Sequence, residues 1–175
     1  MEIKIPLYDL LNKFLTGLVF IGGSVIVCPS HAFTILNSEI VKNLGTGPEI
    51  VVTVAVFATA YELGLIINRF GSAVIEDLFK RYKVIPFNND YTLFNEAKKK
   101  YPIMSTLSRE YALSRTGIAL FLLLVVLSFL ARRWSVGISC FVIMIIYFLS
   151  CRKHADKIVK LMNSVQGTVS AEKQE

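Results

Sequence analysis

Charged residues are scarce in this 175-residue chain, and histidine and cysteine are scarcer still. Only 18% of the residues are charged whereas 54% are hydrophobic, a balance that argues against a water-soluble domain. The three cysteines, Cys28, Cys140 and Cys151, lack the CxxC or Cys/His spacing of a metal site. The two histidines, His31 and His154, fall on opposite sides of the expected membrane, and no phosphate-cradling glycine loop occurs. We therefore expect no metal, no cofactor and no catalytic residue, and a protein that is not an enzyme.

Four apolar runs dominate what is present. A helix needs about 20 mostly apolar residues to cross the roughly 30 Å hydrocarbon core of a bilayer, and flanking residues bring each run close to that length. The sequence thus predicts an all-α, polytopic membrane protein with four transmembrane helices, at about residues 14–30, 50–68, 115–132 and 135–151. The region 69–114 predicts a helical cytoplasmic extension between the second and third spans, and residues 166–175 predict a flexible polar tail.

The first apolar run has a second interpretation. Lys4 and Lys13 precede it, and Ser30-His31-Ala32 after it has the small-x-small pattern of a signal-peptidase site. Residues 1–32 are therefore either a retained helix or a cleaved signal peptide, and both interpretations leave the other spans oriented alike.

Basic residues orient the four spans. In a four-span topology, 16 of the 19 Lys and Arg residues fall on the side that holds both termini and the region 69–114. Because cytoplasmic loops collect Lys and Arg, we expect both termini to be cytoplasmic.

The stretch Ile50–Tyr82 changes from apolar to mixed halfway along. Read as one helix it would be roughly 50 Å long, longer than the hydrocarbon core, so its charged end is expected to project into the cytoplasm. Glu62 lies within the apolar part, where an ionisable group costs several kcal/mol unless it is paired, protonated or facing water. It marks either function or assembly; alternatively it bonds to Tyr61 or to a neighbouring helix and only fixes packing.

Three charges of this stretch, Glu62, Arg69 and Glu76, recur every seven residues. That spacing places them near one helix face, where they are expected to pair across helices or with another copy of the chain. Arg69 has the alternative role of reaching to the membrane interface. Asn68 and Ser72 are expected to add hydrogen bonds across a helix pair.

Small residues predict close helix contacts. Ala60 and Gly64 form a small-xxx-small step, and Gly71-Ser72 forms a second small surface. The expected receiving residues in the first run are Gly17, Gly22 and Gly23. This pattern predicts either a tight contact between spans one and two or packing of oligomers through span two.

Lys98-Lys99-Lys100 and Arg109 make the cytoplasmic region basic. They are expected to contact anionic lipid or a cytoplasmic protein partner, and direct binding of nucleic acid is not expected. Orientation in the membrane alone also accounts for this charge.

The segment Tyr61–Glu76 (YELGLIINRFGSAVIE) resembles a segment of small multi-pass bacterial inner-membrane proteins of anti-phage defence systems, the membrane components of retron-type or Kiwa-type systems. The resemblance implies an inner-membrane effector or sensor, kept quiet by a cytoplasmic partner and released to perturb the membrane. The expected partners are the lipid bilayer and further copies of the same chain. The leading hypothesis is therefore a non-enzymatic, oligomeric membrane effector or sensor. The alternatives are a membrane anchor or structural subunit of a larger complex, and a small transporter or ion-binding protein that uses Glu62.

Overall fold

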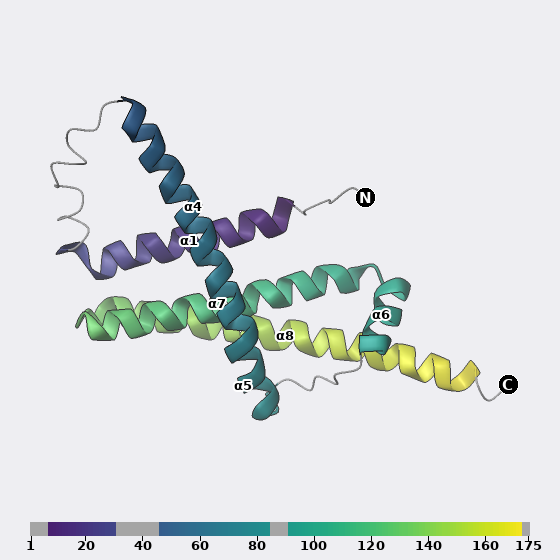
Figure 1. Ribbon diagram of the computed structural model, residues 1–175. Coiled ribbons are helices and arrows are strands. Elements are labelled where there is room, and N and C mark those ends of the chain that lie inside the picture. Colours follow the sequence, from purple (N-terminus) through teal and green to yellow (C-terminus); the bar gives the residue numbers. More distant parts are fainter. Residues whose placement is uncertain (1–6, 31–45, 85–90, 173–175) are drawn as a thin grey trace.

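The computed structural model describes residues 7–30, 46–84 and 91–172 (Figure 1). Every element among them is a helix, and four are long and apolar enough to cross a membrane, which makes the protein all-helical as its sequence predicts. The elements in chain order are α1 (Leu7–Val27), α4 (Thr46–Phe70), η1 (Gly71–Ile75), α5 (Glu76–Arg81), α6 (Tyr91–Lys100), α7 (Ile103–Leu130) and α8 (Trp134–Glu172).

Helices α7 and α8 form a helical hairpin. The chain reverses at Arg132, whose φ of 57° is left-handed. The amide of Arg132 donates to the carbonyl of Phe129 (3.1 Å) and that of Arg133 donates to the carbonyl of Ser128 (2.8 Å). This pair of bonds is a Schellman motif, which satisfies the last carbonyls of α7 and allows the immediate start of α8.

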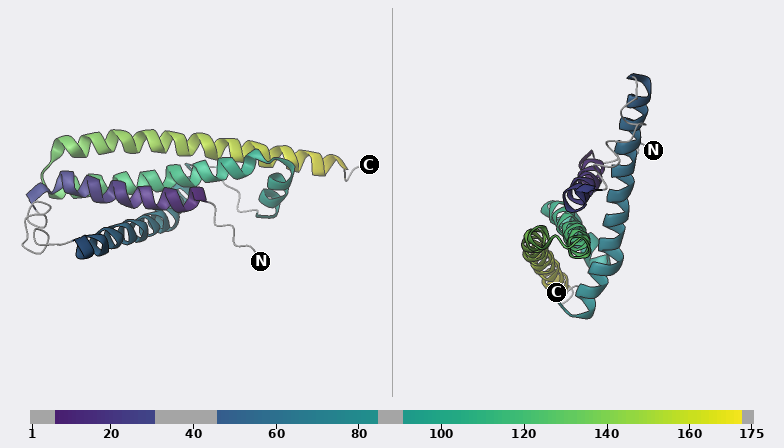
Figure 2. Two further views of the ribbon diagram at one scale, coloured as in Figure 1. Left: turned by 90° about the horizontal axis from the view of Figure 1, so that it is seen from above. Right: turned by 90° about the vertical axis from the view of Figure 1, so that its left-hand side faces the viewer.

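Helix α4 lies differently from the other long helices. In Figures 1 and 2, α1, α7 and α8 run side by side, whereas α4 passes obliquely across α1 and α7. It continues through η1, a π-helical turn, into α5 without a break, so that Thr46–Arg81 forms one rod of roughly 50 Å. We call this continuous segment the α4–α5 rod. Its length exceeds the thickness of a bilayer core, as the sequence predicts for Ile50–Tyr82.

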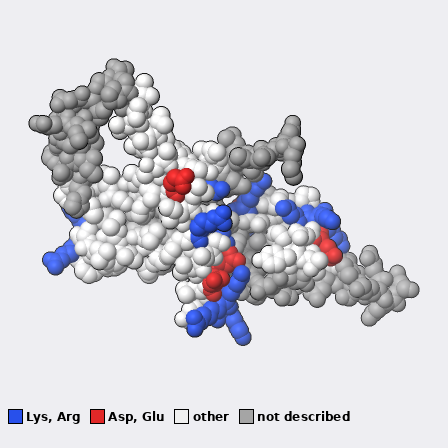
Figure 3. All heavy atoms as spheres, viewed as in Figure 1, with Lys and Arg blue, Asp and Glu red and all other residues white. Residues whose placement is uncertain are grey.

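The core of the protein is centred on α7. Half of the candidate span in α7 is buried, compared with 17% for each of the other three spans. In the first half of α4, every side chain from Glu49 to Thr59 is exposed. Figure 3 shows the left part of the described surface with little charge apart from a basic group at its end, and most Lys and Arg over the middle and the right. Exposed apolar helices of this kind suit a lipid environment.

The polar region between the second and third spans forms a small helical extension. Helix α6 contacts α7 and α8, with Ala97 and Met104 fully buried beside Ile158 and Met162 in one apolar cluster.

The backbone of α8 stays helical to Glu172, although the composition of residues 166–175 favoured an irregular tail. The segment contains no proline and a single glycine, so nothing in it stops a helix that tertiary packing has already started.

Helix α1 packs on both α4 and α7. It therefore forms part of the helical assembly in this structure. Two residues of the alternative cleavage site, His31 and Ala32, lie outside the described residues.

Candidate functional site

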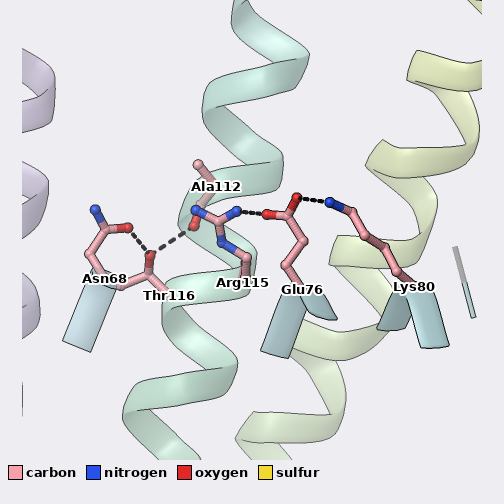
Figure 4. A network of polar contacts seen from close by, with 6 residues as sticks. All are labelled: Asn68, Glu76, Lys80, Ala112, Arg115 and Thr116. Carbon is pink, nitrogen blue, oxygen red and sulfur yellow. Dashed lines mark hydrogen bonds and ion pairs between the residues drawn. The ribbon is translucent and has the colours of Figure 1, made fainter. Parts of the chain in front are cut away.

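A polar junction lies where the α4–α5 rod passes α7. The guanidinium of Arg115 on α7 donates from Nη1 to Oε2 of Glu76, the first residue of α5. The ammonium of Lys80 reaches the other oxygen of the same carboxylate at 3.0 Å. Glu76 thus holds two cations at once, one on its own helix and one on the neighbouring helix (Figure 4).

The Glu76–Arg115 pair is largely withdrawn from solvent. The side chain of Arg115 is 12% exposed and that of Glu76 is 22% exposed, whereas Lys80 is 33% exposed. The face of the Tyr111 ring lies 5.8 Å from the guanidinium carbon of Arg115, which adds a cation–π contact. Breaking a buried pair by removing one partner costs about 3–5 kcal/mol because the other charge is left uncompensated, and partial exposure places this pair toward the lower end.

A second polar contact joins the same two segments. The hydroxyl of Thr116 lies 2.8 Å from Oδ1 of Asn68 on α4 and 2.9 Å from the carbonyl oxygen of Ala112. One hydroxyl hydrogen serves these two acceptors, so the Asn68 contact competes with a bond inside α7. The rod is therefore fixed to α7 by two polar contacts, one on each side of η1.

The π-helical turn η1 explains how Glu76 reaches α7. In a regular α-helix, Glu62, Arg69 and Glu76 would lie near one face. The i→i+5 bonding of Gly71–Ile75 inserts a wider turn before Glu76 and rotates it away from the other two. The expectation that all three charges share a face is therefore wrong: Glu62 and Arg69 are exposed, whereas Glu76 faces α7.

Gly71 allows the close approach at this turn. A Cβ atom built on Gly71 would lie 3.3 Å from the carbonyl oxygen of Arg115 and 3.5 Å from Cβ of Ala119. A larger side chain would therefore push η1 away from the segment of α7 that carries Arg115. Ser72 next to it is half-buried.

Helices α1 and α4 cross even more closely. A Cβ atom built on Gly17 would lie 1.6 Å from the carbonyl oxygen of Ala60, and one built on Gly64 would lie 1.7 Å from the carbonyl oxygen of Lys13. Both distances are far below any real contact, so these two positions require glycine. Of the other expected packing glycines, Gly23 faces the flexible end of Leu124 on α7, and Gly22 has open space beside it.

Several expected site residues stay apart from the junction. Glu62 is exposed, without a hydrogen bond or ion pair from its side chain in the described part of the chain, and Tyr61 is half-buried. The basic residues proposed as a cytoplasmic contact are also exposed, and lie on α6 or on the first turns of α7: Lys98, Lys99, Lys100 and Arg109. The structure therefore brings Asn68 and Glu76 against α7 and leaves Glu62 and the three lysines of α6 exposed. Arg109 is also exposed, but it lines a cavity that Asn68 and Arg115 line as well.

Two polar contacts join α7 and α8, in addition to their apolar packing. Nδ1 of His154 lies 3.1 Å from a carboxylate oxygen of Glu110, and the hydroxyls of Ser114 and Ser150 are 3.1 Å apart. Among the described residues, no group of three His, Cys, Asp or Glu side chains could hold a metal ion.

Sequence reasoning missed Arg115 and Thr116 as site residues. Both stand at the amino-terminal edge of the third apolar run, where Arg115 reads as a boundary marker. The available signal was that Glu76 needs a cation near the membrane edge, and Arg115 is one of several at that level.

Comparisons of the chain with models of protein families, with curated proteins and with solved structures find no match.

Proposed function

We propose that this protein is a non-enzymatic, oligomeric membrane effector or sensor in which the α4–α5 rod carries a cytoplasmic event into the bilayer. The observation that supports this most is the Glu76–Arg115 ion pair at the junction of α5 and α7. It fixes the charged end of the rod, while the apolar half of the rod packs on little besides the α1 crossing. We call this ion pair, with Lys80, the latch.

The latch suits a two-state role because of its place and its strength. A loss of about 3 kcal/mol, the lower value for breaking a buried pair, changes the ratio of two states by roughly a hundredfold. The π-helical turn next to it is the kind of local irregularity that is frequent at functional sites. A partner that competes for Glu76 or Arg115 would therefore release the rod, and the exposed apolar half of α4 would rearrange in the lipid.

Assembly of several copies is part of the proposal. Glu62, Ile66 and Arg69 are exposed along one stripe of α4 at helical spacing. A carboxylate and a guanidinium within a span need partners, and the same residues of another copy provide charges of opposite sign. This supports an oligomer in which released rods meet.

The location and the setting belong to the same proposal. The basic residues favour a topology with both termini in the cytoplasm, and the resemblance of Tyr61–Glu76 suggests a bacterial inner membrane and a role in defence against phage. The cytoplasmic partner that acts on the latch would meet the basic surface of α6, where Lys98 and Lys99 are exposed.

The experiment compares two carboxylate substitutions in living cells. Glu76→Gln removes the latch charge, and Asp77→Asn removes the same charge from the next, exposed position. We expect Glu76→Gln to depolarise the membrane at lower expression than the wild type, and Asp77→Asn to match the wild type. Unchanged membrane potential at high expression of all three proteins would refute the effector function.

An alternative is that the protein anchors a larger complex. The exposed basic surface of α6 favours it, since such a surface fits an acidic soluble partner. In that case both variants retain the partner at the membrane and the potential never changes. The third candidate is a transporter built on Glu62, which is exposed on α4 and is not among the residues that line the cavity between α1, α4 and α7.

A further inference from the structure

A cavity of about 260 Å³ opens between α1, α4 and α7, beside the latch. Three cations line it: Lys13 from α1, and Arg109 and Arg115 from α7. Most of the remaining lining consists of amide and hydroxyl side chains, among them Asn12 and Ser108. The cavity is smaller than the range of roughly 300–1,000 Å³ that holds drug-sized ligands, so its occupant is a small group.

The charge of this cavity is of one sign. No carboxylate is among the side chains that line it. Glu76 does offset Arg115, but from the far side: it takes Nη1 of the guanidinium, and Figure 4 shows the other terminal nitrogen turned away from Glu76, toward the side of Asn68 and Thr116. Three cations from two helices therefore line one space that no carboxylate lines. A basic surface whose side chains point into solvent would not show such an arrangement.

The hydrogen-bonding groups also face an acceptor. Oδ1 of Asn68 already accepts from Thr116, which leaves the amide nitrogen of Asn68 to donate. Arginine and lysine can only donate, and the guanidinium fork matches the oxygens of a phosphate. The cavity thus presents donors and positive charge together, and the complementary ligand is an anion with several acceptor oxygens.

We infer that this cavity binds a phosphate group, either of a lipid headgroup or of a small soluble phosphate ester. A phosphate monoester carries about −1.5 to −2 charge and three strong acceptor oxygens, and the phosphodiester of an anionic lipid headgroup carries about one charge and two unesterified oxygens. Both match a cavity with three cations and several donors. The bound phosphate would tie α1 to α7 through Lys13 and Arg109, next to the polar contact of Asn68 with Thr116. The inference is independent of the effector function, because it concerns binding alone.

The test uses the full-length protein in detergent and in nanodiscs. Inorganic phosphate and glycerol 1-phosphate are titrated calorimetrically into the detergent-solubilised protein. Retention of phosphatidylglycerol relative to phosphatidylcholine is measured by native mass spectrometry after release from mixed nanodiscs. Binding of the soluble compounds identifies a soluble ligand, and selective retention of phosphatidylglycerol alone identifies a lipid headgroup.

Matched variants separate the cavity from general charge. Lys13→Gln/Arg109→Gln removes two lining cations and leaves the latch intact, whereas Arg81→Gln/Lys157→Gln removes two exposed cations elsewhere. We expect the first pair to weaken binding at least tenfold and the second by less than twofold. An equal loss of binding affinity in both double variants, or no binding of any probe to the wild type, would overturn the inference.

A third variant keeps the test decisive if the charge variants unfold. Ala112→Leu places a larger apolar group at the one apolar lining position and changes no charge. We expect it to abolish binding while the thermal unfolding in detergent stays near that of the wild type. A folded Ala112→Leu protein that binds phosphate as the wild type does would also overturn the inference.

Discussion

Gly17 and Gly64 lie against the backbones of one another's helices, so that α1 and α4 cross with no side chain between them at that point. This crossing is the main support of the membrane half of the α4–α5 rod, since every side chain from Glu49 to Thr59 is exposed. The rod is therefore held at two places, by a steric contact within the apolar region and by the latch at its charged end.

Replacing Gly64 with alanine is expected to separate the crossing. A Cβ atom at this position overlaps the carbonyl oxygen of Lys13, and backbone cannot yield as a side chain would. Overpacking of this kind costs typically 1–3 kcal/mol. We expect a lower thermal unfolding temperature in detergent for Gly64→Ala.

The control for this prediction is Gly22→Ala, in the same membrane region. Nothing lies within 4 Å of a Cβ atom built on Gly22, so the substitution adds no contact and gains the better helix propensity of alanine. We expect an unfolding temperature equal to that of the wild type or slightly higher. Equal effects of the two substitutions would contradict a tight crossing at Gly64.

The contact between Thr116 and Asn68 predicts a small, measurable stabilisation. Thr116→Val keeps the shape and removes the hydroxyl, and hydrogen bonds between membrane helices contribute about 0.6 kcal/mol on average and up to about 1.7. Thr59→Val is the matched control, because that hydroxyl is exposed and bonds only to the carbonyl of Ala55 in its own helix. Unfolding titrations in detergent should show the larger loss in free energy of unfolding for Thr116→Val. A loss of the same size in both variants would contradict a stabilising contact between Thr116 and Asn68.

The topology can be tested by labelling single cysteines. Lys99→Cys on α6 and Arg133→Cys in the α7–α8 turn are both exposed, at opposite ends of the bundle. In a background with Cys28 replaced by Ser, a membrane-impermeant maleimide added to spheroplasts is expected to label position 133 and not position 99. The reverse pattern would place both termini outside the cytoplasm.

The sequence allows the four helical spans and their small-residue contact to be predicted because both depend on local composition. Apolar runs of span length and glycines at helical spacing are visible in any one segment, and Gly64 does meet α1 as one of the two expected packings. The helical extension of residues 69–114 follows in the same way, from helical spacing and charge pairs such as Glu76 and Lys80.

The latch could not be predicted because it depends on how two distant segments align. Arg115 is 39 residues from Glu76, and the sequence holds many other cations between the second and third spans. The π-helical turn decides the matter, since it rotates Glu76 toward α7, and no residue pattern in Gly71–Ile75 distinguishes i→i+5 from i→i+4 bonding. Glu62, the strongest candidate by sequence, remains a prediction for assembly.

The latch is most directly tested by exchanging its charges in purified protein. Four proteins are reconstituted into liposomes: the wild type, Glu76→Arg, Arg115→Glu, and the protein with both substitutions. Each single change sets like charges against each other at the junction, whereas the exchange restores an ion pair with its sign reversed. The arginine introduced at position 76 also meets Lys80, but a like-charge pair at this spacing costs only about 0.2–0.5 kcal/mol.

The measurement is the flux of potassium ions from these liposomes. We expect both single substitutions to raise the flux at least tenfold over the wild type, and the exchange to return it to within a few fold. A doubly substituted protein that leaks as much as the single variants, or four proteins with the same flux, would contradict the claim that the Glu76–Arg115 pair holds the rod in its quiet position.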